Sequence, residues 1–347
     1  MVKWLLKEGA LVDVETLGHP HPGRTALHLA ASKRSDAGVR MVRVLIEGGA
    51  KATARTRHGG NSPLHYAIDG RSVETVKALL NAGADPNTTS SSGLAPLHRC
   101  AAIPGQEGIV EALLKGGADP NQKTSMGALS AVRGLSGLTT SRDLWQTYYA
   151  VNTSHTALHI ASKAKDAEKT VKALLAAGAD ASARDSAGRT PLHFAVVKME
   201  PEAVTKLLIE AGTDVNARDV DGKTPLLMLL IAITLQAAQQ PEMAKEDQAA
   251  KERMIRFLLS AGADSHAEGK DKQSPVSWAK QAKLQWAIDL LTQEPHRDDE
   301  PDNESSQQPI ASSKAIANSE LFNHSDGSKI GLLGTQASRW LPKRSRS

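Results

Sequence analysis

One motif returns along the chain at a nearly constant interval, and this limits the fold more than any other feature. The motif reads Thr/Ser-Pro/Ala-Leu-His, and an apolar stripe ending in Gly-Ala follows it. Ser62 and Ala95 stand 33 residues apart, while Thr156, Thr190 and Thr224 follow one another in steps of 34. A fixed period of this size predicts a solenoid, in which each module packs on its neighbours. The copies are RTALHLAA (24–31), NSPLHYAI (61–68), LAPLHRCAA (94–102), HTALHIAS (155–162), RTPLHFAV (189–196), KTPLLMLL (223–230) and, more faintly, QSPVSWAK (273–280).

Each copy predicts two short helices. Thr or Ser is a good N-cap, and Pro fits the first helical position, where its missing N–H costs nothing. In one copy we expect helices over Thr190–Lys198 and Pro201–Glu210, with Gly212 in the left-handed conformation that ends the second. Helices this short do not persist alone, so stacking on neighbours must supply their burial. We therefore expect Leu192 to be buried at a junction between repeats.

These motifs resemble those of the ankyrin-repeat family over roughly Met1 to Gln293. The resemblance implies an all-α solenoid of helix-turn-helix units joined by β-hairpin-like loops. It also implies a structural role for the motif histidines, whose imidazoles would bond the Thr/Ser hydroxyl and neighbouring backbone. These histidines are His28, His65, His98, His159 and His193.

The period divides the chain into seven segments. They are a truncated half-repeat (1–20), ankyrin repeats (21–124), a shrunken repeat (125–151), further repeats (152–219), a repeat with an inserted helical hairpin (220–267), a degenerate capping repeat (268–293) and a polar, disordered tail (294–347). The first segment begins inside a second helix, because VKWLLKEGALVD aligns with Val171–Ser182. We interpret the chain as a fragment, an alternative product or a gene model that begins late; a frayed half-repeat is the alternative.

Two segments depart from the period. Ala95 and Thr156 are 61 residues apart, less than two periods, which suggests a shrunken repeat with helices at Ala128–Val132 and Arg142–Val151. Its aromatic residues Trp145, Tyr148 and Tyr149 are either binding hot spots or internal packing that replaces lost contacts. Farther on, Thr224 and Gly262 are 38 residues apart, so Ile233–Met254 is expected to lengthen both helices and project a polar helical hairpin.

Several function classes find no support in the sequence. Cys100 is the only cysteine, which favours a reducing, intracellular setting, cytoplasmic or nuclear, and the net charge of +4 does not indicate nucleic acid. No HExxH, GxSxG or phosphate-loop motif is present, and helices 8–10 Å apart keep the motif histidines from sharing a metal. We expect no enzyme activity, no cofactor, no metal and no membrane insertion. Cys100 is predicted to be a buried space-filler.

The sequence therefore predicts a monomeric scaffold that binds a protein partner on the concave face of the solenoid. The alternative is the regulatory part of a larger enzyme or receptor whose other domain lies upstream of Met1. Because the motif residues are needed for packing, specificity should lie in variable positions at the hairpin tips. The candidate partner-binding residues are Arg57, His58, Ser91, Ser92, Ser186, Ala187, Val220 and Asp221, together with Trp145, Tyr148 and Tyr149.

Overall fold

The computed structural model describes residues 2–16, 23–57, 59–125, 154–197, 202–239 and 248–293, except for the side chains at 238 and 239. The chain divides into two units, Met1–His296 and Arg297–Ser347, and the described residues all belong to the first. The expected disordered tail at 294–347 lies outside the described residues. In the ranges given above, the regular elements are helices and none is a strand, which confirms an all-α fold.

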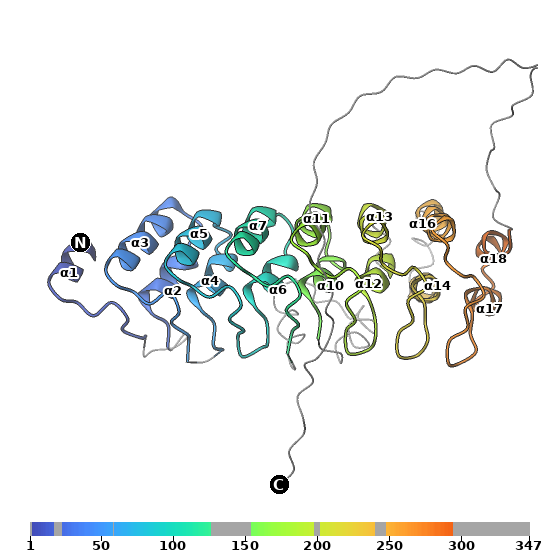
Figure 1. The fold of residues 1–347 in the computed structure, drawn as a ribbon, viewed down its shortest axis with the longest axis horizontal. Coiled ribbons are helices and arrows are strands. Elements are labelled where there is room, and N and C mark those ends of the chain that lie inside the picture. The colour runs from blue at the N-terminus through green and yellow to red at the C-terminus, as the bar shows by residue number, and fades with distance from the viewer. Residues whose placement is uncertain are drawn as a thin grey trace, which may run out of the picture. The chain divides into compact units, whose positions relative to one another are not determined.

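The helices form two rows, and successive helices of the chain belong to one row and the other in turn (Figure 1). The first helices of the repeats are α2 (Ala26–Ala31), α4 (Pro63–Asp69), α6 (Pro96–Ala101), α10 (Ala157–Ala161), α12 (Pro191–Val197), α14 (Pro225–Gln239) and α17 (Pro275–Gln281). The second helices are α1 (Val2–Lys7), α3 (Asp36–Glu47), α5 (Val73–Asn81), α7 (Glu107–Lys115), α11 (Glu168–Ala176), α13 (Glu202–Glu210), α16 (Gln248–Ser260) and α18 (Gln285–Thr292). From α2 onward each first helix packs on its own second helix and on the first helices beside it.

The helix ends follow the local sequence. In α4, Ser62 is the N-cap and Pro63 takes the first helical position, as the motif predicts. Helix α12 spans Pro191–Val197 and α13 spans Glu202–Glu210, both inside the predicted ranges, and the predicted end residues Lys198 and Pro201 lie outside the described residues. Gly212 has φ +84°, so it adopts the left-handed conformation expected after a second helix.

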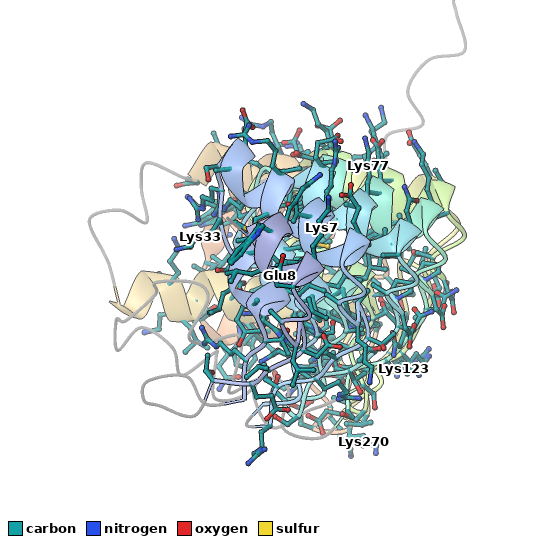
Figure 2. All side chains as sticks on the ribbon, turned by 90° about the vertical axis from the view of Figure 1, so that its left-hand side faces the viewer. Lys7, Glu8, Lys33, Lys77, Lys123 and Lys270 are labelled. Carbon is teal, nitrogen blue, oxygen red and sulfur yellow. The ribbon has the colours of Figure 1, made fainter. Side chains whose placement is uncertain are left out.

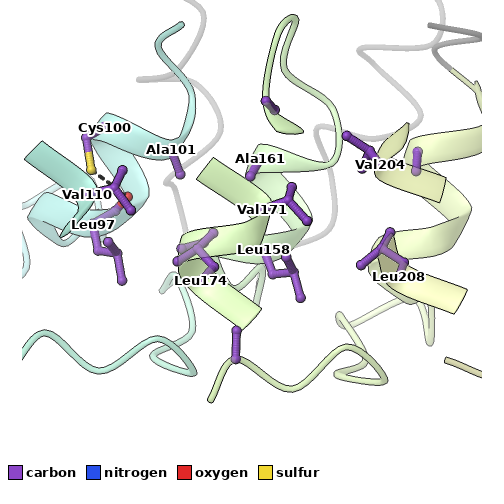
Figure 3. Close-up of a cluster of buried hydrophobic side chains, with 14 of the residues drawn as sticks. Leu97, Cys100, Ala101, Val110, Leu158, Ala161, Val171, Leu174, Val204 and Leu208 are labelled. Atoms are coloured by element: carbon purple, nitrogen blue, oxygen red, sulfur yellow. Dashed lines mark hydrogen bonds between the residues drawn. The ribbon is translucent and has the colours of Figure 1, made fainter. Parts of the chain in front are cut away.

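The core runs from repeat to repeat through the helix pairs, and Figure 3 shows one stretch of it. Leu158 and Val171 face each other between α10 and α11 and are fully buried. Small residues such as Ala161, also fully buried, let the helices approach closely. Leu192 is fully buried, as predicted. Because each stretch of core is shared between adjacent repeats, no helix pair has a core of its own.

Every hairpin between repeats is closed by the same backbone hydrogen bond. The N–H of Asp185 donates to the carbonyl of Arg189 at 3.0 Å, and Asp219 donates to Lys223 at 3.0 Å. The equivalent donor–acceptor pairs are Thr16–Arg24, Thr56–Asn61, Ser90–Leu94, Thr124–His155 and Gly269–Gln273. Most of these bonds enclose a tip of three residues, whereas the Thr124–His155 bond encloses the whole stretch between 125 and 154.

The shrunken repeat predicted at 125–151 lies almost wholly outside the described residues and stays a prediction. The neighbouring repeats pack directly on each other, α10 on α6 and α11 on α7. The described repeats of Ala95 and Thr156 are therefore direct neighbours in the stack. Residues 126–153, with Trp145, Tyr148 and Tyr149, lie outside the described residues. What is described is the point where this segment leaves and re-enters the hairpin, at Ser125 and Ser154.

Both helices of the stretched repeat are longer than usual, as the sequence predicted. Helix α14 has 15 residues and α16 has 13, so both are longer than their counterparts α12, with 7, and α13, with 9. The Trp278 indole N–H of α17 donates to Thr234 Oγ1 in the added part of α14, at 3.1 Å. The segment 240–247, where the predicted hairpin would turn, lies outside the described residues.

Candidate interaction surface

The motif histidines fasten each first helix to the next hairpin. In α10, the backbone N–H of Thr156 donates to His159 Nδ1 at 3.2 Å, and the Thr156 hydroxyl lies 2.9 Å from the same nitrogen. On the other side of the ring, Nε2 lies 3.0 Å from the carbonyl of Arg189. Because Nδ1 accepts a backbone N–H, the hydrogen-bond geometry assigns the hydrogen to Nε2. His28, His65, His98 and His193 reach the carbonyls of Asn61, Leu94, Gln122 and Lys223 in the same way.

Burial keeps these imidazoles neutral. It lowers the pKa of His65, His98 and His193 to about 4 and that of His159 to about 3, and it lowers the pKa of His28 as well. Protonation would also place a hydrogen on Nδ1, where it would face the backbone N–H that now donates a hydrogen bond to that nitrogen. The histidines therefore have the structural role that the family resemblance implies.

The described residues contain neither a cluster of metal ligands nor a helix fit to span a membrane. Within them, no three His, Cys, Asp or Glu side chains come together in a way that could hold a metal ion. Nor does any helix there combine the length and apolar character needed to cross a bilayer. Cys100 is fully buried, and burial raises the pKa of its thiol. A buried thiol of this kind is a poor nucleophile, as the sequence suggested.

Adjacent hairpin tips are hydrogen-bonded to one another. The N–H of Val220 donates to the carbonyl of Ala187 at 2.8 Å, and Ser91 donates to Gly59 at 2.9 Å. Lys270 donates to Asp221 at 2.8 Å in the same register as Val220 to Ala187, and Ser125 donates to Gly93 at 3.2 Å, one tip position farther on. These bonds link the tips in two runs, one from Gly59 to Ser125 and one from Ala187 to Lys270, and we call the exposed side chains of the tips the tip surface.

The predicted partner-binding residues differ in how exposed they are. Arg57, Ser91 and Ser186 are exposed, and Val220 is 51% exposed, so these four belong to the tip surface. Ser92 and Asp221 are half-buried: Ser92 Oγ lies 2.7 Å from Ser90 Oγ, and Asp221 pairs with Lys223 at 3.3 Å. His58 lies outside the described residues, as do the three aromatic candidates.

Ala187 does not meet its prediction. Its side chain is only 7% exposed, because the next hairpin lies against it and its carbonyl accepts the Val220 N–H. The sequence pattern identified it as a variable tip position, but a small side chain there is covered by the neighbouring tip. Ala187 therefore contributes to the stacking of the hairpins and is not available as a side-chain contact.

A ladder of cationic side chains, which the sequence analysis missed, runs along the hairpins. Arg184 Nη1 donates to the Gly188 carbonyl at 2.9 Å and to the Arg218 carbonyl of the next hairpin at 2.6 Å. Lys123 Nζ reaches the Arg184 carbonyl at 3.1 Å, and Arg218 Nη1 reaches the Glu268 carbonyl at 2.8 Å. Arg55 binds the carbonyls of Gly60 and Thr89. Each donor stands at the same hairpin position, and that recurrence was the available signal.

Asparagine side chains make a second ladder nearer the helices. The Asn121 amide donates to the Gly178 carbonyl at 2.9 Å and accepts the Asp180 N–H at 2.7 Å, so it spans two hairpins. Asn87 bridges to Gly117 and Asp119 and Asn216 to Gly262 and Asp264 in the same way. Each ladder residue uses side-chain polar atoms to hold its neighbour in register.

A buried ionic cluster fastens the hairpin after α11. Arg189 lies 2.8 Å from Asp185, and both side chains are fully buried, with His155 Nε2 at 3.4 Å from the same carboxylate. Burial opposes ionisation of Asp185, but His155 and Arg189 outweigh it and lower the pKa of its carboxyl. The Arg189 guanidinium also lies over the ring of Phe194 in α12, 4.8 Å from its centroid. This cluster is packed into the repeat and does not form part of the tip surface.

The position after each motif histidine on the first helices is mostly apolar, with Leu29, Tyr66, Arg99, Ile160 and Phe194 in turn. Leu29 is 39% exposed, while Tyr66 and Arg99 are half-buried. Arg99 binds both carboxylate oxygens of Asp69, at 2.9 and 2.7 Å, and so is fixed in place. These residues differ in chemistry from repeat to repeat, as the tip residues do.

Comparison with known proteins agrees with the geometry. The description "Ankyrin repeats (3 copies)" matches the chain over residues 1–90, 60–124 and 140–236, which together make up more than half of it. The solved ankyrin repeat domain of Bcl-3, a member of the IkappaB protein family, has a TM-score of 0.54 with 24% identity. That match covers 78% of this chain and 98% of the Bcl-3 chain. At this identity the likeness shows the fold.

Two curated relatives match shorter parts of the chain. The E3 ubiquitin-protein ligase KEG of Arabidopsis thaliana is 35% identical over 91 residues, which are 25% of this chain and 6% of that protein. The human SH3 and multiple ankyrin repeat domains protein 2 is 37% identical over 86 residues, 25% of this chain and 4% of that protein. The chain therefore spans less than a tenth of the length of these two relatives.

Proposed function

The chain belongs to the ankyrin-repeat family, and on that premise we propose that it is a non-enzymatic scaffold which binds a protein partner on its hairpin-and-first-helix face. Ankyrin repeats are a general protein–protein interaction module. The observation that carries the proposal is the contrast within the hairpins. Their backbones are hydrogen-bonded from tip to tip, while the outward side chains change from Arg57 to Ser91, Ser186 and Val220.

Rigidity matters here because association costs conformational entropy wherever a surface must be ordered. The tip bonds, the cation ladder and the asparagine ladder order the hairpins before any partner arrives. The energy of side-chain contacts is then available for affinity. Varied side chains on an ordered frame favour recognition of one partner over others.

The remaining parts of the proposal concern the setting. We propose a reducing compartment, cytoplasmic or nuclear, because Cys100 is the only cysteine in the chain. We also propose that the protein acts as a monomer, without a cofactor and without nucleic acid. Nucleic acid is disfavoured on the second helices because their charges are mixed and leave no broad basic surface on that face.

A comparison of two variant sets tests the proposal. The full chain is tagged in its native cell, and its associated proteins are captured after crosslinking. We expect Arg57→Glu, Ser91→Glu and Val220→Glu to remove a specific partner. A control set, Lys77→Glu, Lys115→Glu and Lys206→Glu, changes exposed residues of the second helices α5, α7 and α13 and should retain it. A partner that is kept by the first set and lost by the second would overturn the choice of face.

A further inference from the structure

We propose that Arg55, Lys123, Arg184 and Arg218, the cation ladder, form a docking strip for an extended acidic peptide segment. This inference rests on the proposed scaffold function and names the chemistry of the partner. All four side chains are exposed. They stand at the same position of four hairpins, and the last three belong to consecutive repeats because α11 packs directly on α7.

The first argument is a contrast in how surface cations are paired. On the second helices, most cations with a described partner bind a carboxylate, for example Lys172 with Glu168 at 2.7 Å. The other such pairs are Lys3–Glu47, Arg43–Glu74, Lys77–Glu74, Lys115–Glu111, Lys206–Glu210, Arg253–Glu202 and Arg256–Glu252. Figure 2 shows Lys77, on α5, in the upper part of the view, and Lys123 and Lys270, on hairpins, in the lower part.

The four ladder cations take part in none of the ion pairs among the described residues. They bind neutral carbonyl oxygens instead, as in the 2.6 Å bond from Arg184 to the carbonyl of Arg218. A carbonyl holds the side chain in place without cancelling its charge. A guanidinium has five N–H donors and an ammonium three, so each ladder group keeps donors for a second acceptor. The strip is thus both positive and ordered in advance.

Several carboxylates close to the tips are bound by other cations, whereas Glu268, exposed at the equivalent position of the next hairpin, marks the end of the strip. Asp185 is paired with Arg189, Asp221 with Lys223 and Glu15 with Arg57. A further acidic row stands at the helix end of the hairpins, where each carboxylate accepts a backbone N–H two residues ahead. Its members are Asp85, Asp119, Asp180, Asp214 and Asp264. This row repels an acidic peptide from the helix end and favours a track along the tips.

The repeat spacing sets the spacing of the peptide's acidic residues. Neighbouring helices lie about 8–10 Å apart. An extended chain in the polyproline II conformation advances about 3.1 Å per residue and has three residues per turn, so every third side chain lies on the same side. Three peptide residues therefore match one repeat. Lys123, Arg184 and Arg218 would therefore each meet an acidic side chain at every third peptide residue. Thr89 occupies the ladder position between Arg55 and Lys123, so the acidic residue that meets Arg55 would lie six peptide residues from the one that meets Lys123. A negative charge on each third residue is the predicted recognition pattern.

Nucleic acid is the competing polyanion, and the described surface favours it less. Single strands bind where aromatic side chains stack with bases along a basic groove. The described tips carry Arg57, Ser91, Ser186, Val220 and Lys270, with no aromatic side chain among them. In a duplex, each strand carries one phosphate per about 3.4 Å of helix axis, which does not match one cation per repeat.

The test uses two synthetic peptides of identical composition and fluorescence anisotropy with the full chain. One peptide has Glu at every third position between Gly and Ser residues; the other has the same number of Glu residues in one consecutive block. We expect the spaced peptide to bind several-fold more tightly at 50 mM salt and to weaken as salt is raised. Arg184→Gln with Arg218→Gln should weaken the spaced peptide about tenfold.

Matched variants separate the strip from general charge effects. Arg40→Gln with Lys169→Gln removes two exposed cations from α3 and α11 and should leave binding within about twofold, while Arg184→Lys with Arg218→Lys should keep most of it. Circular dichroism confirms that each variant is folded. Equal binding of both peptides, absence of binding, or equal loss in the two Gln variants would overturn the strip. Tighter binding of a thymidine oligonucleotide, lost in Arg184→Gln with Arg218→Gln, would overturn the choice of a peptide.

The outcome also separates this inference from the scaffold proposal. If a crosslinked cellular partner depends on Arg57, Ser91 and Val220 but not on Arg184 and Arg218, the docking strip is wrong and the scaffold function stands. If that partner depends on neither group but is lost with second-helix variants, the scaffold face itself is wrong.

Discussion

Leu174 in α11 and Leu5 in α1 occupy the same place in two nearly identical segments, VKALL and VKWLL, yet they differ in burial. Leu174 is fully buried, whereas Leu5 is 42% exposed. Helix α11 lies between α10, α7 and α13. Helix α1 has no first helix beside it among the described residues, and Trp4 there is 61% exposed. The difference shows that burial in this fold comes from neighbouring helices and not from the sequence of the helix itself.

Helix α1 nonetheless makes the same contact with the next repeat that inner helices make. Leu6 lies over Gly48 as Leu80 lies over Gly116: a methyl group added at these glycines would meet leucine Cδ1 at 2.6 and 2.7 Å. Asp13 accepts the Lys51 N–H at 3.0 Å. One side of α1 is therefore an ordinary repeat interface. Its other side presents the side chains that the inner repeats bury.

The largest expected effect concerns pH, because the inner repeats depend on neutral histidines and α1 has none. The folded-state pKa of His65, His98 and His193 is about 4 and that of His159 about 3, below the unfolded value of about 6.5. As pH falls from 6.5 toward 4, the unfolded chain binds protons that the folded chain does not. Stability is therefore complete above pH 6.5 and falls by at least about 3 kcal/mol by pH 4.

Urea unfolding at a series of pH values measures this loss. His159→Gln keeps a donor toward Arg189 but cannot titrate, so its stability should fall less steeply between pH 6.5 and 4. A His159→Gln slope equal to that of the parent chain would show that His159 is not held neutral.

The next effect compares the two leucines directly. Leu174→Ala empties a fully buried site and should lower the free energy of unfolding by about 2–5 kcal/mol. Leu5→Ala removes a side chain that is already 42% exposed, so about 1 kcal/mol or less is expected. Chemical denaturation of both variants measures the difference. Equal losses would mean that Leu5 is covered in solution as completely as Leu174.

A smaller effect is expected from the asparagine ladder. Asn121→Ala removes two hydrogen bonds between hairpins, to Gly178 and Asp180, and should cost about 1–2 kcal/mol. Asp13→Ala removes a single bond to Lys51 at the α1 end and should cost about half as much. Hydrogen exchange at the Asp180 and Lys51 amides reports each bond separately. Unchanged protection at Asp180 would show that Asn121 does not hold this register.

The smallest effect is expected at Trp4. Its side chain is 61% exposed, so Trp4→Gln should change the stability by no more than about 0.5 kcal/mol. Thermal unfolding monitored by circular dichroism measures it. A loss of several degrees in the midpoint would indicate that the exposed face of α1 is packed against something in solution.

The candidate site was predicted less completely than the fold. The variable tip positions were found from the repeat, and Arg57, Ser91, Ser186 and Val220 are exposed there. Ala187 was misplaced, because a pattern of variable positions does not show that the next tip lies over this one. The cation ladder was missed for a related reason: Arg184 and Lys123 look like ordinary surface charges until the adjacent carbonyls are in place.

The sequence by itself determined the module: its period, its caps at residues such as Ser62 and Pro63, and its buried face, since each depends on residues close together in the chain. Only the tertiary structure decided which modules touch. Spacing alone does not show that the repeats of Ala95 and Thr156 are direct neighbours, whereas the packing of α10 on α6 and of α11 on α7 does. Contact between repeats depends on where the chain returns, and the number of residues between two motifs does not specify that.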